Sequence, residues 1–123
     1  MQDRPTLDEL LEAVAGFLEQ EVLPTLGDAR LRFRTLVALN ALGIARRELA
    51  DEARHVAADL HDLARLLGHA PPAPGRAGVE ALLRELAARI RAGQAPPDTL
   101  PALQQLVRRK LLVASPNYLR RYP

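Results

Sequence analysis

The feature that most limits the fold of this chain is the spacing of its leucines, which recur three and four residues apart in several separate stretches. This spacing places apolar side chains on one side of an α-helix. Apolar residues make up 48% of the 123 positions and aromatic residues only 3%, so the core must be built from aliphatic side chains. Leu, Ala, Arg and Glu all favour helices. The pattern predicts an all-α protein, and the length fits one domain.

Proline and glycine residues divide the chain into five predicted helices within a single helical domain over residues 1–123. Thr6 followed by Glu9 is the signature of a capping box at the first helix start. Gly93 is expected just after the end of the fourth helix. Short connectors join antiparallel neighbours, so we predict a single-domain helical bundle of about five helices. The predicted bounds are about 6–23, 28–50, 51–67, 78–92 and 99–114, with an extended tail over 115–123.

The second predicted helix is apolar on two sides. One side carries Phe33, Leu36, Val37, Asn40, Gly43, Ile44 and Arg47, and the other carries Leu31, Ala38, Leu42, Ala45 and Leu49. A helix that is apolar on both sides is expected to be buried on both sides, so this helix is predicted to be central. A break near Ala50 is expected to separate it from the third helix, because one continuous helix would be unusually long.

Asn40 places a primary amide in an otherwise apolar run, RTLVALNALGIARREL. Burying an amide without a hydrogen-bond partner costs about 1–3 kcal/mol, so the side chain needs a partner. We expect Asn40 to fix how helices pair, within the bundle or across the two-fold axis of a homodimer. Gly43, one turn further on, and Gly16 in the first helix would allow a second helix to approach closely.

A different interpretation of Asn40 is a ligand contact, with a pocket lined by Phe33, Val37 and Arg47; a catalytic role is the weakest alternative. Arg47 shares the Asn40 side of the helix, and a half-buried arginine requires a carboxylate. A salt bridge to the acidic first helix is therefore expected, with an anion site as the alternative. In the tail, Tyr118 carries an amphipathic ring that is expected to dock on the body or on a second subunit.

His55, Asp59 and Asp62 share one face of the third predicted helix, at a spacing that resembles carboxylate–imidazole metal ligation. That face lies opposite the core stripe of the helix, so we expect it to be solvated. The sequence has no HExxH pattern, no glycine-rich phosphate loop and no GxSxG motif. No catalytic residue, metal site or cofactor is therefore predicted.

Charge and composition limit the function further. The net charge of +2 is too small to indicate a nucleic-acid partner, and the basic stretch RRK at 108–110 lies in no known nucleic-acid-binding signature. Residues 1–27 carry six acids and one base, whereas residues 98–123 carry five bases and one acid. These ends are expected to lie near each other, within or between subunits, or the basic end meets an acidic partner.

Targeting signals and cysteine are both missing from this sequence. Without cysteine, disulfides, thiolate metal sites and a cysteine nucleophile are excluded. The polar, acidic start is unlike a signal peptide, and no apolar stretch reaches the 18 or so residues of a membrane span. We therefore expect a cytoplasmic protein that does not insert into membranes.

Three segments carry a resemblance: the opening MQDRPTLDELLEAVAGFLEQEVLP, the segment FRTLVALNALGIARREL and the ending RRKLLVASPNYL. Together they resemble a bacterial family of small helical proteins that is described only as a domain of unknown function. Ser115 stands where the family pattern leads us to expect asparagine, and Leu112 where we expect alanine. The resemblance covers nearly the whole chain.

The resemblance implies little chemistry, because no activity or catalytic residue comes with the family. Its members are often encoded beside an aminoglycoside-phosphotransferase-like kinase and an acyl-CoA dehydrogenase. It therefore implies a non-catalytic accessory or interaction protein in an acyl-CoA or phosphotransferase pathway, with that kinase or dehydrogenase as a partner. The alternatives are a binder or enzyme for an acyl-CoA or a nucleotide with a pocket near Asn40, and nucleic-acid binding by the basic C-terminal end.

Overall fold

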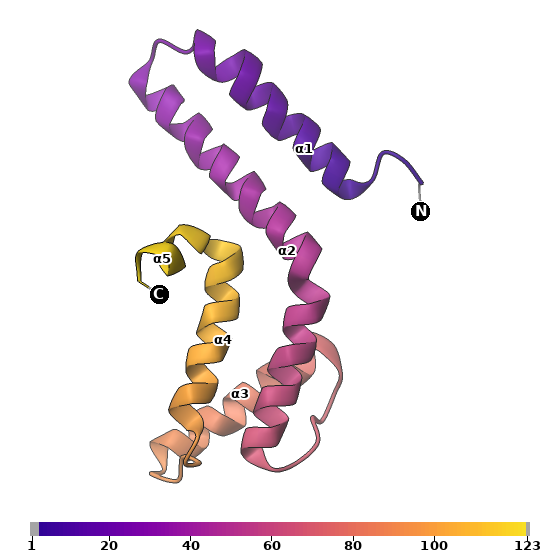
Figure 1. The fold of residues 1–123 in the computed structure, drawn as a ribbon, viewed down its shortest axis with the longest axis vertical. Helices are drawn as coiled ribbons and strands as arrows, with labels where there is room; N and C mark the ends of the chain where they lie inside the picture. Colours follow the sequence, from indigo (N-terminus) through magenta and orange to yellow (C-terminus); the bar gives the residue numbers. More distant parts are fainter. Residues whose placement is uncertain (1–2, 123) are drawn as a thin grey trace. The chain divides into compact units, whose positions relative to one another are not determined.

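The structure is a computed structural model that describes residues 3–122 (Figure 1). Within this range helices account for the regular structure and no strand occurs, which confirms the all-α prediction. Five α-helices follow one another, which agrees with the predicted number: α1 (Leu7–Phe17), α2 (Ala29–Leu67), α3 (Gly75–Arg91), α4 (Thr99–Ala114) and α5 (Pro116–Arg121). No helix of the described residues combines the length and the apolar composition needed to cross a membrane.

The chain consists of two compact units, Met1–Ala50 and Asp51–Pro123, and α2 contributes to both. The helix predicted to be central, over about residues 28–50, forms the first half of α2 and lies within the first of these units.

The N-terminal unit is an antiparallel pair of helices, α1 and the first half of α2 (Figure 1). The predicted capping box starts α1: Thr6 Oγ1 accepts from the Glu9 amide at 3.2 Å, and the Thr6 amide donates to Glu9 Oε1 at 3.1 Å. Asp28 caps α2, because its Oδ1 accepts from the Arg30 amide at 2.8 Å. The capping box predicted at the first helix start therefore forms as expected, and the second start has an aspartate cap.

The first helix is less regular than predicted. The α-helical part ends at Phe17, a π-helical turn follows over Leu18–Val22, and a 3₁₀ turn over Leu23–Thr25 completes the segment. Pro24 lies in that last turn and cannot donate a backbone hydrogen bond, which is why the helix ends there. The predicted end near residue 23 thus lies where the π-helical turn passes into the 3₁₀ turn.

The predicted break near Ala50 is wrong, because α2 is continuous from Ala29 to Leu67. No proline and no glycine occurs between Gly43 and Gly68, so no residue in that stretch forces the backbone out of a helix. The expectation of burial on both sides is also wrong for the first half of α2. None of its residues is buried, and Phe33, on one of the two apolar sides, is 67% exposed.

The C-terminal unit is built by the second half of α2 together with α3, α4 and α5 (Figure 1). Its core is aliphatic, as the composition predicts, and draws on three helices: Leu63, Leu67, Leu82, Leu86 and Leu106. Leu60, Val79 and Leu103 are partly buried around it. All of the fully buried apolar side chains of the described residues belong to this unit.

Gly78 explains how α3 approaches the rest of this unit. A Cβ atom at Gly78 would lie 1.9 Å from the Ala73 carbonyl oxygen and 2.8 Å from Leu60 Cδ2. Both distances are far below van der Waals contact, so only glycine fits here. The helix begins at Gly75, three residues before the predicted start, and ends at Arg91. Gly93 follows with a φ of +72°, as its predicted position after the helix end requires.

The last helices agree with the prediction in one case and differ in the other. Helix α4 has the predicted bounds, Thr99–Ala114. The tail, which we predicted to be extended, instead forms α5 over Pro116–Arg121 and packs on α4. Pro116 occupies the first turn of α5, where its fixed φ favours a helix and its missing N–H has no partner to lose.

Candidate functional site

Two apolar stripes remain exposed on the N-terminal unit, and the first lies on α1. Leu7, Leu10, Val14 and Phe17 are spaced three, four and three residues apart, which places them on one side of the helix. All four are between 42% and 57% exposed. Leu11, Ala15 and Leu18 lie on a different side of the same helix and are half-buried. Helix α1 therefore has one apolar side within the hairpin and another that is unpartnered.

The second stripe lies on α2 and contains three of the four residues predicted to bind a ligand, Phe33, Val37 and Asn40; we call it the Asn40 stripe, and Leu36 completes it. All four side chains are exposed. The half-buried residues Thr35, Leu39, Leu42 and Arg46 mark the side of α2 that packs on α1. The Asn40 stripe faces away from that side. Because Asn40 is exposed, water can satisfy its amide, and a buried partner within the chain is not required.

Arg47, the fourth predicted ligand residue, lies two turns after Asn40 on the same side of α2 and is half-buried. Its guanidinium folds back over Gly43, where a Cβ atom would lie 3.3 Å from Arg47 Nη1. The surface that we predicted Gly43 to offer to a second helix is thus partly covered by this side chain. Gly16, the other small residue singled out for close approach, has open space above it.

Arg46, the neighbour of Arg47, makes a salt bridge to the first helix. Arg46 Nε lies 2.9 Å from Asp8 Oδ1, Arg46 Nη2 lies 3.2 Å from Asp8 Oδ2, and Arg46 Nη2 lies 3.7 Å from Glu12 Oε2. The hydrogen bond from Arg46 lowers the pKa of Asp8 below its ordinary value, and the same bond raises the pKa of Arg46. This bidentate pair joins α1 to α2 across the hairpin.

In the C-terminal unit, the face that we expected to be solvated is instead an ion-pair site. Arg109 Nε lies 2.6 Å from Asp59 Oδ1, and Arg109 Nη2 lies 2.7 Å from Asp62 Oδ2. The side chains of Arg109 and Asp59 are only 16% and 14% exposed. Burial disfavours the charged guanidinium, but the hydrogen bonds to Asp59 and Asp62 outweigh it and raise the pKa of Arg109.

This arrangement changes two interpretations made from the sequence. The Asp59–Asp62 pair binds an arginine from α4, and no group of three metal-ligating side chains occurs in residues 3–122. The RRK stretch also loses its central charge to this internal pair, which weakens it as a nucleic-acid site. Sequence spacing pointed to the carboxylates but could not identify Arg109 as their partner, because 47 and 50 positions separate them.

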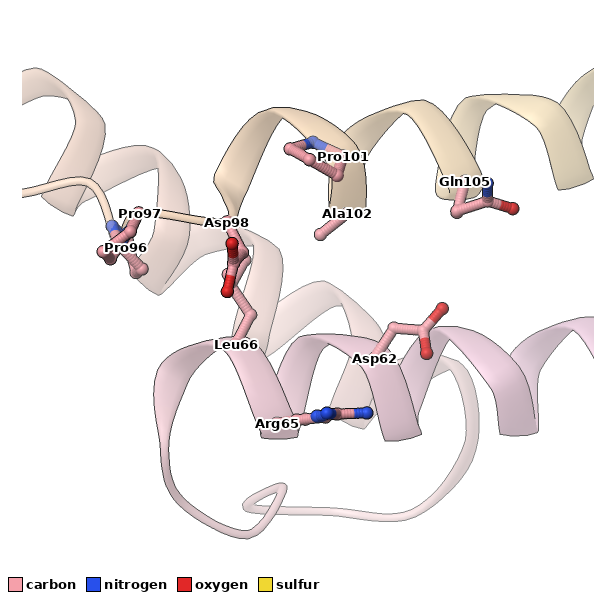
Figure 2. Close-up of a pocket in the computed structure, with 9 residues that line it drawn as sticks. All are labelled: Asp62, Arg65, Leu66, Pro96, Pro97, Asp98, Pro101, Ala102 and Gln105. Atoms are coloured by element: carbon pink, nitrogen blue, oxygen red, sulfur yellow. The ribbon is translucent and has the colours of Figure 1, made fainter.

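A shallow pocket lies beside this ion pair, between α2, the connector before α4 and the start of α4 (Figure 2). Its volume is about 370 Å³. Figure 2 shows the Asp62 carboxylate directed toward α4 and Gln105 on the opposite side. Arg65 and Asp98 add one charge each, and neither forms an ion pair within the described chain. The rest of the wall is apolar or proline: Leu66, Pro96, Pro97, Pro101 and Ala102.

Another titratable contact joins α3 to the segment just after α2. His69 Nε2 lies 2.8 Å from Glu85 Oε2, and His69 Nδ1 lies 2.8 Å from the Ala70 carbonyl oxygen. Both ring nitrogens face acceptors, and only the imidazolium can donate from both. The hydrogen bond to Glu85, followed by that to Ala70, accordingly raises the pKa of His69. His69 thus joins the segment after α2 to Glu85 of α3.

Tyr118, predicted to dock on the body or on a second subunit, lies in α5 and pairs with Tyr122. The ring centroids are 4.9 Å apart with an angle of 44° between the planes. Tyr118 remains 50% exposed, so one side of its ring is still available to a partner. Its role in an interface stays a prediction.

A family model described as "Domain of unknown function (DUF6285)" matches residues 24–118, which is more than three-quarters of the chain. The chain therefore belongs to this family. The match confirms the resemblance to a domain of unknown function from α2 to the first residues of α5. Most of the opening segment lies outside the matched range. Searches of curated proteins and of solved structures found no significant match.

Proposed function

We propose that this member of the DUF6285 family is a non-catalytic accessory protein that binds another protein through the Asn40 stripe of α2. The observation that supports this most is the difference between the two halves of α2. The second half contains the buried residues Leu63 and Leu67, whereas the first half contains none. On one side of the first half, Phe33 is 67%, Leu36 49% and Val37 51% exposed. Full burial of such a side chain stabilises a complex by about 1.5–3 kcal/mol. Contiguous exposed apolar surface of this kind marks protein interaction sites.

Asn40 gives the stripe its specificity in this proposal. A buried helix interface penalises an amide without a partner by about 1–3 kcal/mol. A binding partner that offers a hydrogen bond opposite Asn40 is therefore favoured over one that offers only apolar groups. Arg47, which lies near this stripe, adds a positive charge at its edge.

The partner that we propose comes from the resemblance described above. The resemblance implies that family members are often encoded beside an aminoglycoside-phosphotransferase-like kinase and an acyl-CoA dehydrogenase, so those two enzymes are the first to test. A cytoplasmic location belongs to the same proposal and fits a chain without cysteine.

The test uses two valines that differ only in their position. Val37 on α2 and Val107 on α4 are 51% and 49% exposed, and both lie in helices. The neighbouring kinase and dehydrogenase are each mixed with the wild type, V37E and V107E, and binding is measured by calorimetry. We expect binding by the wild type and V107E and at least a tenfold loss in V37E. No binding to either enzyme, or equal losses in both variants, would contradict the proposal.

A second candidate function is the binding of a small molecule in the pocket beside Asp62. The observation in its favour is that Arg65 and Asp98, of opposite charge, both line it without an ion pair in the described chain. The volume of about 370 Å³ lies at the small end of the range for ligand sites. Nucleotides and acyl-CoA thioesters would be held there only in part.

A thermal-shift panel of acyl-CoA thioesters, ATP with magnesium and small hydroxy acids tests this second candidate. A ligand at a hundred times its dissociation constant stabilises a protein by about 2.7 kcal/mol. A shift that disappears in R65A would support the pocket, and one that disappears in N40A would move the site to the predicted location at Asn40. A flat panel would leave the accessory function as the one to pursue.

A further inference from the structure

The other exposed stripe of the N-terminal unit has a chemistry that fits a second copy of the same chain. On α1, Leu7, Leu10, Val14 and Phe17 repeat with the three–four spacing of a helix that packs lengthwise on another. On α2, Ala38 and Ala45 follow Leu31 at seven-residue intervals, and Leu49 lies five full turns after Leu31. These four residues are exposed as well. We call the two sets together the hairpin face.

Both sets lie on one side of the hairpin. The α1–α2 contact is marked by Leu11, Ala15 and Leu18 on one helix and by Leu39, Leu42 and Arg46 on the other. At 100° per residue, each set of the hairpin face is rotated from its line of contact by roughly 60–120° in the same sense. In an antiparallel pair, equal senses of rotation place both sets on the same side. The Asn40 stripe is rotated in the opposite sense.

The shape of the hairpin face is complementary to itself. Its α1 half carries large side chains, and its α2 half carries alanines between two leucines. If two copies meet with α1 of one over α2 of its partner, large residues lie over small ones in both halves at once. A two-fold axis generates this arrangement, because each surface then meets its complement on the other copy.

The charges of the hairpin are complementary in the same arrangement. Residues 7–25 carry five acids and no base, and residues 29–50 carry five arginines and one acid. Within the described chain, Arg46 uses Asp8 and Glu12, whereas Glu19, Glu21, Arg30 and Arg34 form no ion pair. The hairpin thus has unpaired acids in the π-helical turn that follows α1 and unpaired bases in the first turns of α2. A second copy, placed with α1 over α2, supplies opposite charges to both.

We propose that the protein is a homodimer in which two hairpin faces form a four-helix bundle, with α1 of each copy packed on α2 of its partner. This inference goes beyond the proposed accessory function and uses a different surface. It places the homodimer interface on the hairpin face, whereas the sequence singled out Gly16, Asn40, Gly43 and Tyr118. It also gives the N-terminal unit the core that the single chain lacks, since a pair of short helices with no buried residue is marginal alone.

The experiment is the native mass of the wild type and three valine variants, measured by light scattering across protein concentrations. Val14 on α1, Val37 on α2 and Val107 on α4 are 50%, 51% and 49% exposed. We expect 27 kDa, twice the 13.5 kDa chain, for the wild type, V37E and V107E. We expect 13.5 kDa for V14E, because a carboxylate would be buried in the dimer.

Charge reversal keeps the test decisive if V14E fails to fold. E21R and R34E each place like charges opposite one another, and we expect each to weaken dimerisation about tenfold, more at low salt than at high salt. The double variant restores opposite charges and should recover the wild-type dissociation constant. A monomeric wild type at all concentrations would overturn the proposal. So would a dimer that V37E disrupts and V14E leaves intact.

The outcomes separate this proposal from the accessory function. If V37E loses the partner enzyme but stays dimeric, both proposals stand. If V14E becomes monomeric and no enzyme binds, the dimer stands and the accessory function fails.

Discussion

The two units of this chain use the same residues to opposite effect. In the C-terminal unit, three helices surround five buried leucines. In the N-terminal unit, two helices of similar leucine content bury none, and nine of the fifteen large apolar side chains that are exposed in the described chain lie there. Leucine periodicity therefore produces helices in both units. A closed core forms only in the C-terminal unit, where a third helix is present. The N-terminal unit therefore depends on its surroundings for stability.

The largest expected effect comes from truncating the closed core. Leu82 is 1% exposed and packs among the other core leucines, so L82A should cost about 2–5 kcal/mol of unfolding free energy. Leu39 is only half-buried in the N-terminal unit, so L39A should lower the unfolding free energy clearly less. Denaturant unfolding of both variants checks this. Equal losses would show that the N-terminal unit has a core of its own.

Substitutions at Gly78 and Gly16 should change the stability of the two units in opposite directions. A methyl group at Gly78 meets the Ala73 carbonyl oxygen, so G78A should destabilise the C-terminal unit by about 1–3 kcal/mol. Gly16 lies inside α1 with open space above it, so G16A should stabilise the helix by about 0.5–1 kcal/mol. Thermal unfolding should show a lower melting temperature for G78A and a higher one for G16A than for the wild type. A destabilised G16A would indicate that another helix fills that space in the native protein.

The ion pairs of the two units should differ as well. R109M leaves Asp59 and Asp62 without their partner in a largely buried site, and we expect a loss of about 1–3 kcal/mol. R46M removes the exposed pair with Asp8, and its effect should be smaller. Both are read from denaturant unfolding at neutral pH. The ranking would be contradicted by an R46M loss equal to that of R109M.

The smallest expected effects concern pH and have opposite signs in the two units. The raised pKa of His69 means that its bond to Glu85 contributes fully below the ordinary value near 6.5 and is lost as the pH rises through the native pKa. The lowered pKa of Asp8 means that its bond to Arg46 contributes above the ordinary value of 3.8 and is lost as the pH falls. Stability differences between the wild type, H69Q and D8N, measured from pH 3 to 8, should show both trends. E85Q should abolish the first trend, and its persistence there would exclude Glu85 as the cause.

Local signals in the sequence predicted the helices well. Thr6 and Glu9 formed their capping box, and Thr99–Ala114 was predicted with the observed bounds. The break near Ala50 was wrong because the expectation came from helix length alone, while no residue there interrupts a helix. The tail was wrong because Pro116 was read as a stop, although proline also favours a helix start.

The candidate site was less predictable, for a physical reason. The sequence identified Phe33, Val37 and Asn40 as one side of a helix, but periodicity cannot distinguish a side buried in the chain from one that awaits a partner. Arg109 was missed for a related reason. Its partners are about fifty residues away, and only the packing of α4 on α2 brings them together.

The most direct measurement is amide hydrogen exchange followed over a hundredfold range of protein concentration. We expect amides of residues 7–22 and 30–49 to become more protected as the concentration rises, because assembly completes the core of the N-terminal unit. Amides of α3 and α4 should exchange at the same rate throughout, since their core is closed within one chain. Protection of the N-terminal unit that equals that of α3 and does not change with concentration would contradict the account.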